Sequence, residues 1–151
     1  MKTTTSFFLF LLLFISITSC KKESAAGKEP KTVTELLAYK GWKYTSVKAS
    51  ATTDGTYEEM LSLSPACAKD NIFYFKEDGT YYISDGATKC SSGTPDVIET
   101  GTWSFFEGED EINVSKTGGS TVRWQITLLD KNNFNASYYG ASLYWKQSMS
   151  H

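Results

Sequence analysis

The chain has 151 residues and a formal net charge of −2, because 17 acidic residues slightly outnumber 15 lysines and arginines. This balance argues against nucleic-acid binding, which needs a basic face. The only histidine is the last residue, His151, so there is no internal histidine for a catalytic pair or a histidine-based metal site. We therefore expect a protein that is not an enzyme and holds no cofactor or metal.

An apolar run occupies residues 7–17, after a positive charge at Lys2. It is too short for a transmembrane helix, which needs about 20 apolar residues, and it fits the apolar region of a secretory signal peptide. The run ends in Ile17-Thr18-Ser19-Cys20, which resembles the lipobox of bacterial lipoproteins. The resemblance implies cleavage before Cys20 and acylation of that residue, and several acyl chains on one residue give stable membrane attachment.

The residues after the lipobox are polar, small and charged, without any periodicity, which is typical of a flexible tether. We therefore divide the chain into a lipoprotein signal peptide (1–19), a lipidated cysteine with its tether (20–31) and a folded domain (32–151). We expect the protein in the bacterial cell envelope, anchored by lipid to the outer membrane on its periplasmic face or at the cell surface.

The folded domain begins with Thr32 and Glu35, whose spacing is that of a capping box and predicts a short helix over 32–40. Apolar and polar residues then alternate with period two, as in strands with one buried face. The pattern predicts eight strands, at residues 42–49, 72–76, 80–84, 97–106, 112–116, 121–129, 134–139 and 142–147.

Mostly short turns join the predicted strands, and Asp78-Gly79 is the clearest hairpin signal. Eight antiparallel strands in simple order close naturally into a barrel, which removes sheet edges. We therefore expect an all-β fold, an eight-stranded up-and-down antiparallel β-barrel with a short N-terminal helix. On the strand at 121–129 the alternation assigns four residues to the buried face, which are Val122, Trp124, Ile126 and Leu128.

Cys67 and Cys90 remain once Cys20 is acylated, and two cysteines in a secreted domain suggest one disulfide. The midpoint between them in the sequence falls at the Asp78-Gly79 turn. Folding the chain at that turn brings the two cysteines opposite each other, so we predict a bridge between them.

Three motifs lie at corresponding points of this pattern: Gly41-Trp42 at the first strand, a Phe-x-x-Asp-Gly-Thr-Tyr hairpin from Phe75 to Tyr81, and Gly101-Thr102-Trp103. With the lipobox, they resemble the lipocalin-like lipoproteins of Gram-negative bacteria over residues 33–147. The resemblance implies a lipocalin-like barrel closed at one end by Trp42. Lipocalins have Gly-x-Trp where Gly41 and Trp42 are adjacent here, and they place a basic residue over that tryptophan, a position that Lys146 or Arg123 could fill.

Inward-facing aromatic residues allow two interpretations of function. They form the wall of a pocket for a small hydrophobic ligand, with residues 60–63 as a lid, or they fill the barrel as a solid core. The candidate ligand-lining residues are Trp42, Tyr44, Phe73, Phe75, Tyr81, Trp103, Phe105, Trp124, Ile126, Tyr138 and Trp145.

A filled barrel would instead act as an interaction or inhibitor module for an unidentified protein partner in the envelope. It would present the loop at 85–96, or the outward-facing Tyr82, Tyr139 and Tyr144, to that partner. An internal cavity distinguishes the two interpretations.

Overall fold

The computed structural model describes residues 29–151, so the expected signal peptide and Cys20 lie outside the described residues. The elements in chain order are α1 (Val33–Ala38), β1 (Trp42–Ser50), β2 (Glu58–Glu59), the 3₁₀ turn η1 (Leu61–Leu63), α2 (Ala66–Lys69), β3 (Ile72–Phe75), β4 (Thr80–Ser84), β5 (Val97–Phe105), β6 (Glu111–Lys116), β7 (Thr121–Leu129), β8 (Asn133–Gly140) and β9 (Leu143–Ser150).

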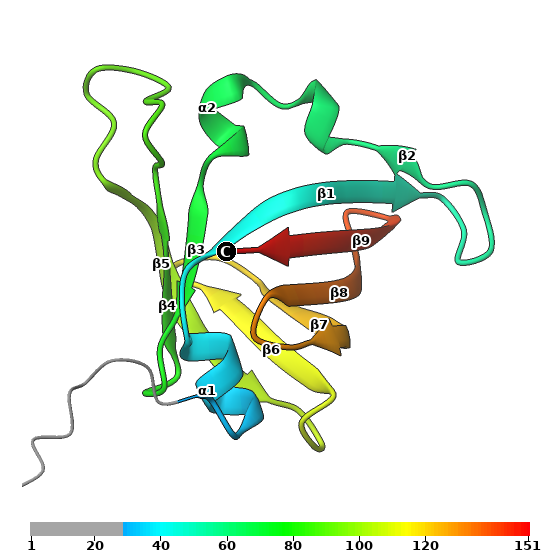
Figure 1. Ribbon diagram of the computed structural model, residues 1–151. Coiled ribbons are helices and arrows are strands. Elements are labelled where there is room, and N and C mark those ends of the chain that lie inside the picture. Colours follow the sequence, from blue (N-terminus) through cyan, green and yellow to red (C-terminus); the bar gives the residue numbers. More distant parts are fainter. Residues whose placement is uncertain (1–28) are drawn as a thin grey trace, which may run out of the picture.

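Eight strands form a closed, antiparallel, up-and-down barrel (Figure 1). Each strand from β3 to β9 pairs with the next one, and β1 closes the ring by pairing with β3 on one side and with β9 on the other. The short strand β2 is an addition that pairs with the far end of β1. The prediction of an eight-stranded all-β barrel is confirmed.

The end of the barrel next to α1 is filled by large side chains. Trp42 and Phe134 are fully buried, and their rings meet edge to face with centroids 5.6 Å apart. The indole Nε1 of Trp42 donates a hydrogen bond to the carbonyl oxygen of Leu37 at 2.8 Å, which ties α1 to the barrel. Thr32 and Glu35 form a capping box at the start of this helix.

The hairpin motif from Phe75 to Tyr81 contacts the Gly101-Thr102-Trp103 motif. The backbone N–H of Trp103 donates to the carbonyl oxygen of Gly79 at 2.7 Å, and its indole Nε1 donates to that of Lys76 at 3.0 Å. Gly79 has a φ of 81°, a left-handed conformation that favours glycine in a tight turn. Gly101 lies against the ring of Tyr81, where a Cβ atom would collide. These glycines therefore allow the β3–β4 turn and β5 to pack closely.

A bulge in β7 changes which residues face the core. The pairing of β7 with β8 shifts between Ile126 and Leu128, so Leu128 is 44 % exposed, while Leu129 packs against the core beside Phe134. One extra residue in a strand inverts the faces that follow it. The assignment of Leu128 to the buried face was therefore wrong.

The residue over Trp42 also differs from the expectation. The Arg123 guanidinium lies over the ring of Phe106, 3.3 Å from its centroid, and the Lys146 ammonium lies 4.0 Å from the centroid of Tyr57. The imidazole of His151 packs on Trp42 instead, with centroids 4.0 Å apart, and its Nδ1 donates to the Gly41 carbonyl oxygen at 2.8 Å. Neither proposed basic residue covers the tryptophan.

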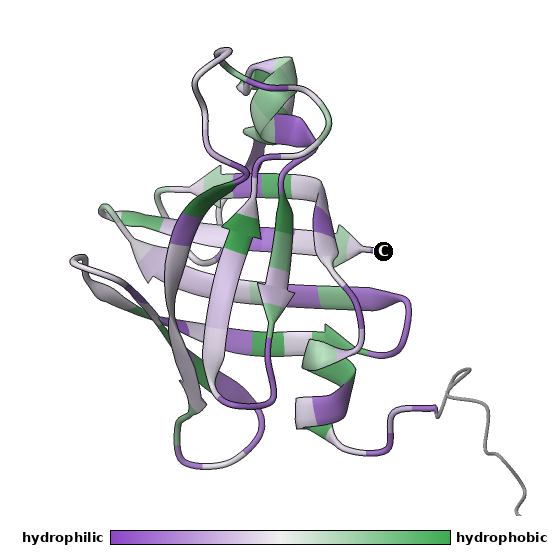
Figure 2. Cartoon of the chain, turned by 90° about the vertical axis from the view of Figure 1, so that its left-hand side faces the viewer, coloured by the Kyte–Doolittle hydropathy of each residue, from purple (hydrophilic) through white to green (hydrophobic). Residues whose placement is uncertain are grey.

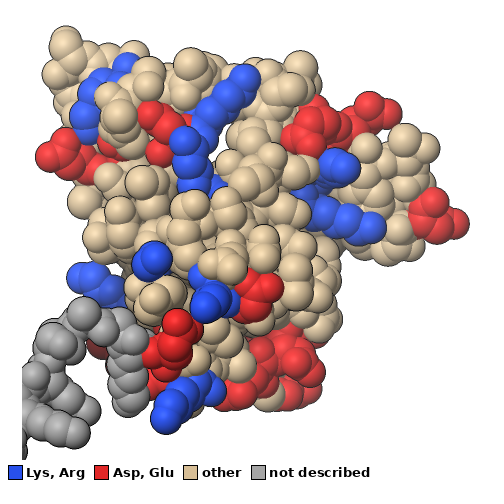
Figure 3. All heavy atoms as spheres, in the orientation of Figure 1, with Lys and Arg blue, Asp and Glu red and all other residues tan. Residues whose placement is uncertain are grey.

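Hydrophilic and hydrophobic residues alternate along the strands of the barrel (Figure 2). Basic and acidic side chains are interspersed on the face drawn in Figure 3, without a large area of one sign. Within residues 29–151, none of the helices has the length and apolar character needed to cross a membrane.

Two aromatic residues on β8 test the assignment of inner and outer faces. Phe134 is 0 % exposed and Tyr139 is 58 % exposed. We expect Phe134→Ala to lower the free energy of unfolding by about 3–5 kcal/mol, because it leaves a cavity in a packed core. Tyr139→Ala, the control, should cost less than about 1 kcal/mol. Urea unfolding measures both, and equal losses would contradict the orientation of β8.

Candidate functional site

A cavity of about 480 Å³ opens at the end of the barrel opposite α1. The barrel contributes Tyr44, Val47, Phe73, Ile83 and Trp145 to its lining. The connection between β1 and β3 contributes Met60, Leu61, Leu63, Ser64, Ala68 and Asn71. We call residues 57–69 of this connection the cover. None of the lining side chains carries a charge, and most of them are apolar.

Glu59 attaches one end of the cover to β1. Its carboxylate accepts hydrogen bonds from the hydroxyl of Ser46 at 2.7 Å and from the backbone N–H groups of Val47 and Leu61, both at 3.1 Å. The hydrogen bond from Ser46, followed by that from Val47, holds the pKa of Glu59 below its ordinary value. The backbone N–H of Met60 also donates to the carbonyl oxygen of Val47 at 2.7 Å. This end of the cover is therefore held in place by the strand.

A disulfide between Cys67 and Cys90 attaches the other end of the cover to the loop between β4 and β5. The predicted bridge is thus confirmed. Nearby, Asp70 accepts a hydrogen bond from the backbone N–H of Thr88 at 2.8 Å, and this bond is the main cause of the lowered pKa of Asp70. Gly86 lies directly against Asp70, where there is no room for a Cβ atom. The cover is therefore fixed at both ends.

Polar side chains occur inside the barrel next to the cavity. The hydroxyl of Tyr44 donates to Oε1 of Gln147 at 3.3 Å, and that of Tyr81 donates to Oε1 of Glu99 at 2.9 Å. The other carboxylate oxygen of Glu99 accepts from the ammonium of Lys116 at 2.6 Å. The carboxylate of Glu99 is therefore occupied from both sides.

The electrostatic environment keeps these hydroxyl groups neutral. Burial raises the pKa of Tyr44 far above its ordinary value, and electrostatic interaction with Tyr138, Glu99 and Tyr81 adds to the shift. Burial also raises the pKa of Tyr81, with Glu99 as the second cause. Both tyrosines therefore keep their protons and remain hydrogen-bond donors at neutral pH.

Gln147 is a polar residue that our reading of the sequence did not assign to the site. It is only 2 % exposed, and its Nε2 atom has no hydrogen-bond partner within the described part of the chain. The sequence did contain a signal, because Gln147 continues the alternation of Leu143 and Trp145 along the last strand. A glutamine at a buried position of a strand indicates a polar contact inside the barrel.

The aromatic residues proposed from the sequence to line a pocket divide into two groups. Tyr44, Phe73 and Trp145 line the cavity. The others lie outside its lining: Trp42, Phe75, Tyr81, Trp103 and Trp124 are core residues, Phe105 and Ile126 pack against them, and the ring of Tyr138 stacks between Trp124 and Trp145. The barrel is therefore solid at the α1 end and hollow at the opposite end.

The lid expected at residues 60–63 lies where the cavity needs a cover, since Met60, Leu61 and Leu63 all line it. Val47, Ala68 and Asn71 also line it, although no pattern in the sequence indicated these three residues. Among residues 29–151, no group of three or more histidine, cysteine or acidic side chains is placed to hold a metal ion. The chemistry available at the cavity is therefore that of apolar contacts and neutral hydrogen bonds.

Replacing both cysteines tests how the cover is held. We expect Cys67→Ser with Cys90→Ser to lower the free energy of unfolding by about 3 kcal/mol, because the bridge no longer restricts the unfolded chain. Hydrogen exchange should increase in residues 60–69, whereas exchange in β7 and β8 should change little under native conditions. The reduced wild-type protein is the control and should behave like the double variant. Unchanged exchange in the cover would show that the bridge does not hold it.

No family model matches the chain, and no curated protein matches it in sequence. The barrel, its cavity and the cover are therefore the observations on which a function can be based.

Proposed function

We propose that the protein binds a small hydrophobic ligand in the cavity between the barrel and the cover, without catalysing a reaction. The observation that carries this proposal is an open cavity of about 480 Å³ with a mostly apolar lining. Small-molecule sites have volumes of roughly 300–1,000 Å³ and a similar lining. A barrel that served only as a rigid support would be expected to close-pack its interior throughout.

The attachment of the cover at both ends supports the same proposal. Glu59 and the Cys67–Cys90 bridge hold the cover over the cavity before any ligand binds. A site formed in advance loses less conformational entropy on binding than one that must be ordered by its ligand. The proposed lipocalin-like character of the protein agrees with a binding function of this kind.

We also propose that the protein is a lipoprotein anchored through Cys20 to the outer membrane. The lipobox-like sequence and the polar tether after it support this location. The described chain begins at the α1 end of the barrel, away from the cavity (Figure 1). A tether leaving from that end would keep the cavity accessible while the domain remains attached to the membrane.

Filling the cavity tests the binding function. Ala68 lines the cavity, whereas Ala66, on the same helical turn α2, is exposed. We expect Ala68→Phe to weaken binding of the uncharged fluorescent probe N-phenyl-1-naphthylamine by about tenfold or more, equivalent to at least about 1.4 kcal/mol. Ala66→Phe, the matched control, should bind the probe like the wild type.

Either of two results would contradict the binding function. The first is a wild-type protein that does not bind the probe at any accessible concentration. The second is binding that Ala68→Phe and Ala66→Phe affect equally. Both would favour the alternative, in which the barrel presents its loops to a protein partner. Native mass spectrometry of the protein purified without detergent would add support if a small molecule co-purified with it.

Replacing the acylated cysteine tests the anchor. We expect the wild type to partition into the detergent phase of a Triton X-114 separation and Cys20→Ser to remain in the aqueous phase, because serine offers no thiol for the lipid. Cys67→Ser with Cys90→Ser is the control, since it also replaces cysteine by serine but leaves Cys20 in place and should keep the anchor. A Cys20→Ser protein that stays with the membranes would disprove the anchor.

A further inference from the structure

We propose that the ligand is an uncharged, mostly apolar molecule with a hydrogen-bond-accepting oxygen, such as a ketone or an ester, and that the hydroxyl of Tyr44 donates a hydrogen bond to that oxygen. Gln147 positions this hydroxyl through a hydrogen bond between the two side chains. The inference rests on the proposed function of the cavity and names the class of ligand that the cavity selects.

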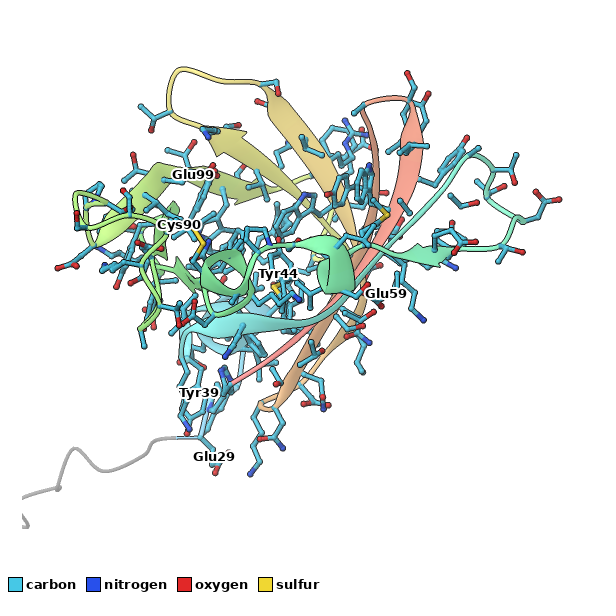
Figure 4. The ribbon with its side chains drawn as sticks, turned by 90° about the horizontal axis from the view of Figure 1, so that it is seen from above. Glu29, Tyr39, Tyr44, Glu59, Cys90 and Glu99 are labelled. Carbon is cyan, nitrogen blue, oxygen red and sulfur yellow. A yellow bond between two sulfur atoms is a disulfide. The ribbon has the colours of Figure 1, made fainter. Side chains whose placement is uncertain are left out.

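Among the barrel residues that line the cavity, Tyr44 is the one that carries a hydroxyl group. It lines the cavity, and Figure 4 shows it near the centre of the barrel when viewed from the covered end. Its hydroxyl donates to Oε1 of Gln147, but the distance of 3.3 Å is long for a hydrogen bond between two oxygen atoms. The hydroxyl is therefore held only by a weak hydrogen bond.

Gln147 and Tyr44 together have more polar hydrogens than acceptors available to them. The amide has two hydrogens on Nε2 and the hydroxyl has one, yet the pair makes a single hydrogen bond, and Nε2 has no partner in the described part of the chain. A buried donor without an acceptor is destabilising. A ligand oxygen would supply the missing acceptor.

A flip of the Gln147 side-chain amide, which exchanges the positions of Oε1 and Nε2, makes use of the ligand acceptor. In the turned arrangement Nε2 of Gln147 donates to the hydroxyl oxygen of Tyr44, and the hydroxyl hydrogen is then directed to the ligand. The unpaired N–H of the free protein thereby gains a partner, and the amide carbonyl loses one. An unpaired carbonyl is the more readily tolerated of the two inside a protein.

The lining of the cavity argues against a charged ligand. No lining side chain carries a charge, so a carboxylate or an ammonium group would be buried without a counter-ion. The carboxylate of Glu99 is already paired, because it accepts from both Tyr81 and Lys116.

Asn71 is an amide residue of the cavity lining, and its Oδ1 atom is buried without a hydrogen-bond partner among residues 29–151. Because an amide can present either its oxygen or its nitrogen, Asn71 accommodates a donor or an acceptor on the ligand. It therefore tolerates further polar groups, such as a hydroxyl, and the selection for an acceptor comes from Tyr44.

Three probes with the same naphthalene ring system test this inference. They are the uncharged ketone 2-acetylnaphthalene, the hydrocarbon 2-ethylnaphthalene and the anion 2-naphthoate. Their dissociation constants follow from displacement of N-phenyl-1-naphthylamine from the purified protein. We expect the ketone to bind the wild type more tightly than the anion. We expect Tyr44→Phe to reduce the preference for the ketone over the hydrocarbon by about tenfold, the equivalent of one hydrogen bond.

Tyr139→Phe is the matched control, because it removes a hydroxyl from the exposed face of the barrel and should leave all three constants unchanged. An unchanged ratio of ketone to hydrocarbon binding in Tyr44→Phe would overturn the role of this hydroxyl while leaving the binding function intact. Tighter binding of 2-naphthoate than of the ketone would overturn the uncharged class, and this comparison needs no variant. A wild type that binds none of the probes would overturn the binding function itself.

Discussion

Closure of the sheet through β1 is the constraint on which the remaining structure depends. This strand pairs with β9 along most of its length, from Lys43 opposite Ser150 to Ser50 opposite Tyr144, and with β3 at its beginning. An eight-stranded barrel has an interior just wide enough for side chains or for one small ligand. Because the interior is that narrow, the size of each inward-facing side chain decides whether its level of the barrel is solid or hollow.

The interior differs between the two ends of the barrel. Near α1, the interior is occupied by Trp42, Phe75 and Phe134. The rings of Trp42 and Phe75 each meet that of Phe134 edge to face, at centroid distances of 5.6 and 5.9 Å. At the opposite end, Tyr44, Phe73 and Trp145 border the cavity together with the smaller Val47 and Ile83. The aromatic core thus provides stability at one end, and the cavity remains at the other without a gap in the sheet.

The cover would not be stable by itself. Its elements are a strand of 2 residues, a 3₁₀ turn of 3 residues and a helix of 4 residues, all shorter than an isolated helix or hairpin needs. Its position comes from attachments to the barrel, through Glu59 at one end and the Cys67–Cys90 bridge at the other. The binding region is therefore the part of the molecule in which covalent and hydrogen-bonded links replace regular secondary structure.

Local patterns in the sequence were enough to predict the strands, the closed barrel and the disulfide. The period of two, the Asp78-Gly79 turn and the position of Cys67 and Cys90 on either side of it all depend on neighbouring residues. Only the tertiary structure decided which positions face inward after a bulge. The shift at Thr45 directs Val47 into the cavity, and the shift in β7 exposes Leu128. An alternating pattern does not reveal where a strand contains one extra residue. Such a residue nevertheless exchanges the inward and outward faces of all the residues that follow it in the strand.

The sequence also left open whether the barrel was filled. That outcome depends on the summed volumes of side chains from eight strands at each level of the barrel, which no short segment contains. For the same reason, the sequence could not predict the packing of His151 on Trp42 or the unpaired amide of Gln147 beside Tyr44. Residues about a hundred positions apart meet at both places, so closure of the barrel created these contacts. The sequence by itself determined the architecture, and tertiary packing decided where it is hollow and which polar groups face the cavity.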